Sequence, residues 1–328
     1  MTAMESVCGI ILLTPRRGRR GSAMAHQIPS ELAKRWWLNC VSCSEASMTT
    51  QLRSVGADHQ VFEQAAHPLS GGFMNSGRGC GLLTGSILAA GVLARQRFDD
   101  DDTAIAAAMS TACRLAKAFP DFTGSVNCGE ITGADLTTIG GRLRYLGTGS
   151  GSRCGHHHLK WGSHASGLIE ESLSEFEDGA PERECANCAV ATLRRLATAV
   201  GMEPRDTVLV AGLAGGVGLL GNICGALASG VYAISAAEYI HSDTESRDSW
   251  LRGGLQELTG SAYRGEPSRL RLAFIDEFGS ELCLDIVGRL FRDGDDHSEY
   301  ITDGGCRDVI HFVVRRVEAE LGSCADSS

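Results

Sequence analysis

Apolar side chains recur at spacings of three and four residues along most of the chain, which is the period of an amphipathic helix. Seven stretches have this pattern over helical lengths: 43–54, 82–95, 103–118, 164–176, 188–200, 223–239 and 306–321. Only TVLVAG (207–212) has the β-branched run of a short strand, and VFEQAAH (61–67), which occupies the same place in the repeat described next, does not. The pattern therefore predicts an all-α protein in which 207–212 is a helix or a loop.

The chain contains two copies of one unit. Segment 39–56, NCVSCSEASMTTQLRSVG, aligns with segment 184–201, ECANCAVATLRRLATAVG. In both segments a Cys-x-x-Cys motif precedes a helical stretch that ends at glycine. A glycine-rich loop with one cysteine follows in each copy, GGFMNSGRGCGLLTG (71–85) and GLAGGVGLLGNICGALASG (212–230).

The remaining cysteines keep the same order in both copies. Cys128 and Cys283 each stand four residues after the glycine of a stretch that contains two Phe and an acid, and Cys154 and Cys306 open the last helical stretch of each copy. Ten of the 13 cysteines pair in this way. The unpaired ones are Cys8, Cys113 and Cys324. A cysteine used only as a small apolar residue has little reason to recur at five matched places, so we expect a chemical role.

The duplication predicts two homologous helical-bundle repeats related by a pseudo-twofold axis. We place repeat 1 at 31–178 and repeat 2 at 179–328, because acids, Gly and Pro interrupt the helical period in EFEDGAPERE (175–184). Residues 1–30 are expected to form a flexible arm, and Met24 is an alternative start.

Composition and charge restrict the class of protein. The chain has 328 residues, 43% of them hydrophobic, and a net charge of −10, which is typical of a soluble globular protein and does not favour nucleic acid. No apolar run reaches the roughly 18 residues that a membrane span needs, and CGIILLT near the start is too short for a signal sequence. We therefore expect a cytoplasmic protein, in which many cysteines indicate metal or redox chemistry more often than structural disulfides.

The glycine-rich loops predict an electropositive setting for their cysteines. A loop that runs into a helix leaves backbone N–H groups unpaired, and the helix N-terminus adds partial positive charge. We therefore expect lowered pKa values for Cys80 and Cys224. Glycines on both sides would let the backbone approach a bulky cofactor. The candidate cofactor-binding glycines are Gly77, Gly79, Gly81, Gly218, Gly221 and Gly225.

Two other interpretations of these loops are weaker. A tight turn where helices cross would also use glycine, but it would not explain the cysteine in both copies. AGLAGGVGLLG (211–221) has glycine spacing like that of a dinucleotide-binding turn, yet the strand–helix–strand pattern around such a turn is missing.

Three kinds of chemistry fit the cysteines of one copy. Four thiolates can hold the four irons of a cubane cluster or a single tetrahedral zinc ion. A Cys-x-x-Cys motif at a helix start is equally a dithiol redox signature. The candidate redox thiols are Cys40, Cys43, Cys185 and Cys188. The spacing alone does not separate these three alternatives.

The order of a leading Cys, a Cys-Gly box, a third Cys after a Phe/Gly stretch and a fourth Cys before the last helix resembles the C_GCAxxG_C_C family of redox-active proteins. The resemblance covers residues 36 to about 320 and implies a fused tandem pair of family units. It implies metal or redox roles for Cys43, Cys80, Cys128, Cys154, Cys188, Cys224, Cys283 and Cys306. The boxes depart from the pattern at Leu82, where the family has Ala, and at Ser229, where it has Gly.

From these residues we expect each repeat to bind an iron–sulfur cluster and to pass electrons to a partner oxidoreductase or electron carrier. A metal-free thiol–disulfide protein is one alternative, and a zinc-binding or structural helical scaffold is the other. Histidines 156–158 follow Cys154, but RDV (307–309) takes their place in the second copy, so we expect them to form a solvated helix face.

Overall fold

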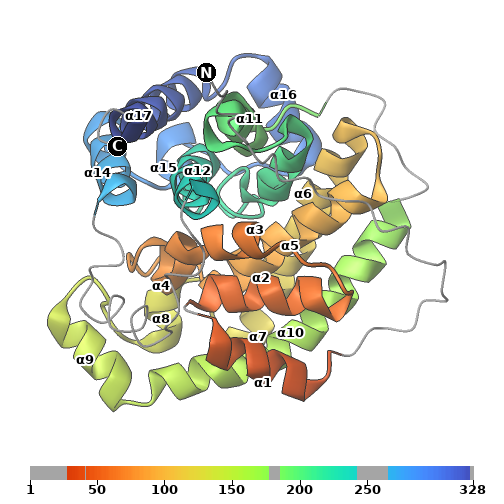
Figure 1. Ribbon diagram of the computed structural model, residues 1–328, viewed down its shortest axis with the longest axis vertical. Coiled ribbons are helices and arrows are strands. Elements are labelled where there is room, and N and C mark those ends of the chain that lie inside the picture. Colours follow the sequence, from red (N-terminus) through yellow and green to blue (C-terminus); the bar gives the residue numbers. More distant parts are fainter. Residues whose placement is uncertain (1–27, 41, 177–184, 242–264, 326–328) are drawn as a thin grey trace, which may run out of the picture.

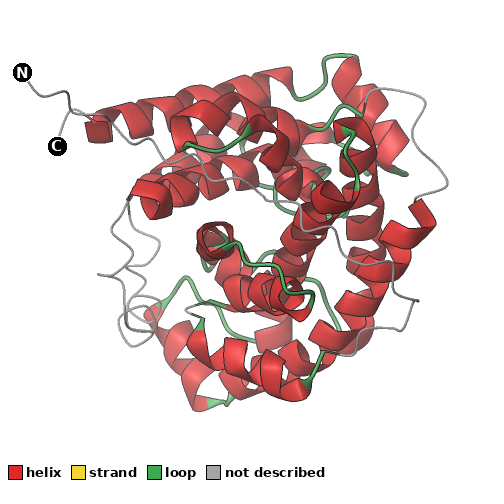
Figure 2. Ribbon diagram, turned by 45° about the vertical axis from the view of Figure 1, so that its right-hand side comes forward, coloured by secondary structure: helices red, strands yellow, loops and turns green. Residues whose placement is uncertain are grey.

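The computed structural model describes residues 28–40, 42–176, 185–241 and 265–325 (Figure 1). Every element named in these ranges is a helix, and the pairing of extended backbone is limited to one isolated bridge between Ile223 and Leu282 (Figure 2). The all-α prediction is therefore confirmed. Segment 207–212 belongs to the 3₁₀ helix η3 (Pro204–Leu213), as the comparison between the two copies predicted. Residues 1–27 and most of the predicted linker lie outside the described residues.

The helices of the two halves follow one another in the same order. The first half contains α1 (Ser30–Asn39), α2 (Cys43–Ser54), α3 (Gln60–Ala65), η1 (His67–Leu69), α4 (Ser70–Phe73), α5 (Gly81–Arg97), α6 (Asp101–Ala118), α7 (Pro120–Thr123), α8 (Cys128–Thr132), α9 (Ile139–Gly147) and α10 (Ser150–Glu175). The second half contains α11 (Cys188–Val200), η3, α12 (Gly225–His241), α14 (Glu266–Phe278), α15 (Cys283–Val287), α16 (Gly294–Thr302) and α17 (Arg307–Ala325). Helices α2, α5, α8, α9 and α10 correspond to α11, α12, α15, α16 and α17, which is consistent with the predicted duplication.

Helix α5 forms the centre of the apolar core. Its sequence is apolar on all sides, and all but three of its 17 residues are buried, as expected for a helix enclosed by others. It packs on α2 and α6 of its own half and also on η3 of the other half. Gly91 permits this last contact, because a side chain at that position would overlap the backbone of Leu209.

The second half returns the same contact. Helix α12, the counterpart of α5, packs against α3 of the first half, and the Tyr232 hydroxyl donates a hydrogen bond to the Phe62 carbonyl at 2.9 Å. Each half thus packs its central helix against the other, and the main apolar core is continuous through both repeats. A separate small cluster contains Cys128, Ala134 and Leu136. In the part of the chain described here, no helix combines the length and apolarity needed to cross a bilayer.

One histidine of the 156–158 run is not solvated, which corrects the prediction. His158 is fully buried, whereas His156 is exposed. The Nε2 atom of His158 lies 3.2 Å from the Ala33 carbonyl oxygen of α1 and 3.2 Å from the Thr50 hydroxyl of α2, and burial lowers the pKa of its imidazole to about 4. In a helix such as α10 every third or fourth residue points inward, so consecutive histidines differ in their exposure to water.

We predict that His158 makes the fold acid-sensitive. In the unfolded chain an imidazole has a pKa of about 6.5. Between about pH 6.5 and 4 the unfolded state therefore binds a proton at His158 that the native state does not bind. The stability that neutral His158 contributes is present above pH 6.5 and is lost as the pH falls toward 4. Urea unfolding at pH 7 and 4.5 should show His158→Gln losing about 2–3 kcal/mol less than the wild type. Equal losses in both proteins would contradict this role.

Candidate functional site: two groups of four cysteines

The eight cysteines that both copies share lie at the beginnings of helices. Four of them are the first residue of a helix: Cys43 of α2, Cys128 of α8, Cys188 of α11 and Cys283 of α15. Cys80, Cys224 and Cys306 directly precede α5, α12 and α17, and Cys154 lies one turn into α10. Backbone N–H groups act on the sulfurs of Cys80, Cys188 and Cys224.

Local capping fixes where the leading helices begin. The Ser42 hydroxyl accepts a hydrogen bond from the Glu45 N–H at 3.3 Å, and the Asn187 side chain accepts one from the Val190 N–H at 2.9 Å. Ser and Asn are favoured at this position because their short polar side chains reach the free N–H groups of the first turn. In each half the capping residue directly precedes the leading cysteine and so sets its position.

The cysteines of each half converge. In the first half burial, and after it the charge of Cys154, raises the pKa of Cys80, and the charges of Cys154, Cys43 and Cys128 add to the effect of burial on the pKa of Tyr145. We call Cys43, Cys80, Cys128 and Cys154 site 1. In the second half the charges of Cys306, Cys224 and Cys283 all raise the pKa of Cys188. We call Cys188, Cys224, Cys283 and Cys306 site 2. The eight cysteines that the sequence singled out as one set per copy are thus brought together as two sets.

The glycine-rich loops position the second and third cysteines of each site. The Cys80 N–H donates to the Val126 carbonyl at 2.7 Å, and the Gly129 N–H donates to the Gly77 carbonyl at 2.9 Å. The second half has the same two links, from Cys224 to Glu281 at 2.8 Å and from Leu284 to Gly221 at 3.0 Å. The loop therefore holds the segment of the third cysteine beside the start of the central helix.

Both loops contain a run of left-handed backbone at matching positions. Residues 71–75 and 215–219 have positive φ without interruption, although the runs include Phe73, Met74 and Val217. Each such L-residue costs about 1–2 kcal/mol relative to the right-handed conformation. A strained conformation that occurs at the same place in both copies indicates that the site requires this loop shape.

The candidate glycines are needed for backbone shape and close approach. Gly77, Gly79, Gly218 and Gly221 have positive φ. Gly81 lets α2 approach α5, because an added Cβ would lie 2.5 Å from the Cys43 sulfur. At Gly225 a Cβ would lie 2.6 Å from the Leu213 carbonyl oxygen. Contact with a cofactor remains a prediction for all six.

The predicted lowering of the pKa of Cys80 and Cys224 is wrong for the free thiols. Burial raises the pKa of Cys80 to about 12, and the backbone N–H groups of Leu82 and Leu83 oppose this rise only in part. Burial likewise raises the pKa of Cys224 against the N–H groups of Ala226 and Leu227. Loss of water thus outweighs the helix N-terminus, and both thiols stay protonated unless a cation joins them.

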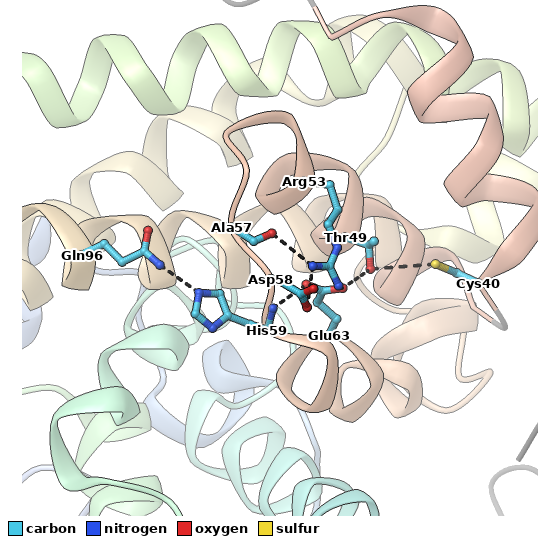
Figure 3. Close-up of polar contacts among 8 residues, drawn as sticks. All are labelled: Cys40, Thr49, Arg53, Ala57, Asp58, His59, Glu63 and Gln96. Carbon is cyan, nitrogen blue, oxygen red and sulfur yellow. Dashed lines mark hydrogen bonds and ion pairs between the residues drawn. The ribbon is translucent and has the colours of Figure 1, made fainter. Parts of the chain in front are cut away.

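The first cysteine of each Cys-x-x-Cys motif has polar neighbours outside the two sites. The Cys40 sulfur lies 3.8 Å from the Thr49 hydroxyl, in a polar group that includes Arg53 and Glu63 (Figure 3). The charges that act on Cys185 are those of Asp102 and Asp295, and its N–H donates to Asp102 at 2.9 Å. Cys40, Cys43, Cys185 and Cys188 are free of disulfide bonds. Only the second member of each motif belongs to a site.

Sequence reasoning missed a tyrosine at each site. Burial raises the pKa of Cys154, and a hydrogen bond that the Tyr145 hydroxyl donates to its sulfur opposes this rise. Burial, and after it the charges of Cys306 and Cys283, raises the pKa of Tyr300, which is therefore a neighbour of both thiols. Both tyrosines are the seventh residue of a nine-residue helix, α9 and α16. They are separated by the same 155 residues as Cys128 and Cys283, so extending the alignment past the third cysteine would have found them.

The two loops meet between the sites. The Asn222 side-chain amide donates to the Asn127 side-chain oxygen at 2.9 Å, and the Gly79 N–H donates to the same oxygen at 3.3 Å. A small cavity at this meeting point has matched residues on its walls: Leu69 with Leu213, Phe73 with Val217, Gly79 with Ile223, and Thr84 with Ala228. Sites 1 and 2 are thus built on neighbouring loops of one molecule.

A comparison with protein families matches both halves of the chain to one family. The family described as "Putative redox-active protein (C_GCAxxG_C_C)" matches residues 41–157 and again residues 186–320. The chain belongs to this family. Each matched region contains one complete site, and both regions begin just after the cysteines that lie apart, Cys40 and Cys185. The tandem C_GCAxxG_C_C organisation is therefore confirmed. No curated protein and no solved structure matched the chain.

We predict that Tyr145 controls the reactivity of Cys154. In reduced, metal-free protein, Tyr145→Phe removes a hydrogen bond to the thiolate, so the pKa of Cys154 should rise. Alkylation by iodoacetamide at pH 8 should slow about tenfold at Cys154, because only the thiolate reacts and such a bond contributes at least about 1.5 kcal/mol. Peptide mass spectrometry measures the rate at each cysteine. Tyr300→Phe is the matched control, and an unchanged Cys154 rate in Tyr145→Phe would refute the role.

Proposed function

We propose that each half of this C_GCAxxG_C_C protein binds an iron–sulfur cluster on its four cysteines and exchanges electrons with a partner oxidoreductase. The observation that carries the proposal is that four thiols from four separate helices lie close enough in each half to act on one another or on one shared tyrosine. Membership of a family of redox-active proteins supports it, because that family's matched regions contain these two sites.

The setting of the thiols suits a cationic iron core. The charges that raise the pKa of Cys188 and Cys283, after burial, are those of other cysteines of site 2. Buried thiolates need a compensating cation, and metal binding supplies it while it releases the thiol protons. When bound, an iron–sulfur cluster supplies one-electron redox chemistry.

The chain's own groups would then tune the site. The N–H groups of Leu82 and Leu83 at site 1, and those of Ala226 and Leu227 at site 2, act on the sulfurs of Cys80 and Cys224. Hydrogen bonds to sulfur stabilise the more negative, reduced state and so raise the reduction potential. Burial of Cys80 and Cys224 in the apolar core keeps water away from the same atoms.

A cluster and a zinc ion make different demands on the four sulfurs. A tetrahedral zinc ion holds its sulfurs at about 2.3 Å from a single point, whereas the cysteines of a four-iron cluster bind different irons. Among the described residues no three His, Cys, Asp or Glu side chains are arranged to hold a metal ion, so the thiol geometry favours neither group over the other. The iron and zinc contents of the protein decide between them. The dithiol alternative has less support, because Cys40 and Cys185 face other residues.

We expect the two sites to load independently. Protein purified without oxygen should lose about half of its iron and acid-labile sulfide in Cys80→Ser or Cys224→Ser, and nearly all in the double variant, because each change removes one of four ligands from one cluster. Chemical analysis of iron and sulfide, together with the visible spectrum, measures this. Cys113→Ser is the control, since Cys113 belongs to neither site. Full iron content in Cys80→Ser would exclude site 1 as the binding site.

A further inference from the structure

Helix α9 covers site 1 and turns an apolar face outward. Ile139, Leu143 and Leu146 are 71%, 64% and 51% exposed, and their spacing of four and three residues places them on one face of the helix. None of the nine residues of α9 is buried, and the helix lies at the edge of the molecule (Figure 1). Its inward residue is Tyr145, which contacts Cys154. Within the described residues, this apolar face has no partner.

Such a face is costly for a protein in water. Large aliphatic side chains stabilise a protein when they are buried, and these three contribute little of that stabilisation. Contiguous exposed apolar groups with polar neighbours mark interaction surfaces. The position of this surface, directly outside a redox site, indicates that its partner takes part in the redox reaction.

The charges near α9 are basic although the protein is acidic. Arg142 and Arg144 lie on α9, which has no acidic residue, and Arg153 lies in the next helix beside Cys154. The nearest carboxylates in sequence are Glu130 and Asp135, whose pKa values are lowered by hydrogen bonds from Ser125 and Thr137, so both are ionised. The three arginines exceed these two carboxylates by one positive charge. The chain as a whole carries a net charge of −10. A partner that docks on α9 therefore gains from negative charge.

The corresponding helix at site 2 has the opposite character. Helix α16 carries Asp295, Asp296 and Glu299 and no lysine or arginine. It contacts α6, and none of its residues is among the exposed large apolar side chains. The apolar, basic surface is therefore specific to site 1 and does not follow from the duplicated fold.

We propose that the outer face of α9 is the docking surface for an acidic electron-carrier protein, which exchanges one electron with site 1. This rests on the proposed function. In the transfer, the reduced carrier loses one electron and the oxidised centre at site 1 gains it; no bond breaks and no proton moves. Small interfaces of this kind hold transient redox complexes, and complementary charge steers their formation.

Binding of a soluble acidic two-iron ferredoxin, used as the probe, tests the docking surface apart from redox chemistry. Calorimetry at low salt should show weak binding that declines as salt rises, because exposed charges are screened. Leu143→Gln and Arg144→Glu should each weaken it about tenfold, equivalent to about 1.4 kcal/mol. The controls are Leu38→Gln, a leucine 59% exposed on α1, and Arg195→Glu, an exposed arginine on α11; both should bind as the wild type does.

The remaining outcomes separate the docking surface from the cluster. Ferredoxin binding to protein without iron would support the docking surface and contradict the proposed function. A loaded cluster with no binding, or equal binding by Leu143→Gln and the wild type, would overturn the docking surface alone. Sedimentation that shows a dimer of this chain, dissociated by Leu143→Gln, would assign the face to a second copy and would also overturn it.

Discussion

The cost of ionising a thiol away from water decides whether the cysteines of this protein are neutral or anionic. Each half gathers four thiols where water is largely excluded, and burial with mutual repulsion raises the pKa of Cys80, Cys188 and Cys283. Helix N-termini act against this rise but do not overcome it. The sites are therefore neutral when empty and become anionic only with a cation in their midst, which is the state in which the N–H groups contribute most.

The rest of the fold serves to hold these thiols in place. Left-handed loops set the second cysteine, short helices α8 and α15 carry the third, and α10 and α17 bring the fourth from the far end of each copy. The central helices α5 and α12 pack against the opposite half, so the two copies stabilise each other as the subunits of a symmetric dimer would. A change in one half should therefore affect the stability of both.

Periodicity and repetition predicted much of this from sequence. The stretches 43–54 and 188–200 coincide with α2 and α11. The roles of the eight matched cysteines remain a prediction. Helix α9 was missed because its apolar residues face outward and its glycines weaken the helical pattern. Cys40 and Cys43 form a Cys-x-x-Cys motif in the sequence. The sequence could not show that the Cys40 thiol lies beside Thr49.

Other features depended on burial, which sequence does not report. The pKa of Cys80 rises because desolvation outweighs two N–H donors, and that balance requires knowing how deep the sulfur lies. His158 could not be separated from His156 without knowing which side of α10 faces α1. Tyr145 was within reach of the alignment but has no motif of its own.

The content of iron, acid-labile sulfide and zinc in protein purified without oxygen tests the central claim most directly. Two four-iron clusters predict about eight irons and eight sulfides per chain, with broad visible absorbance. Colourless protein without iron would contradict the account. Zinc in its place would then indicate a structural site, and the absence of both metals would indicate thiol chemistry.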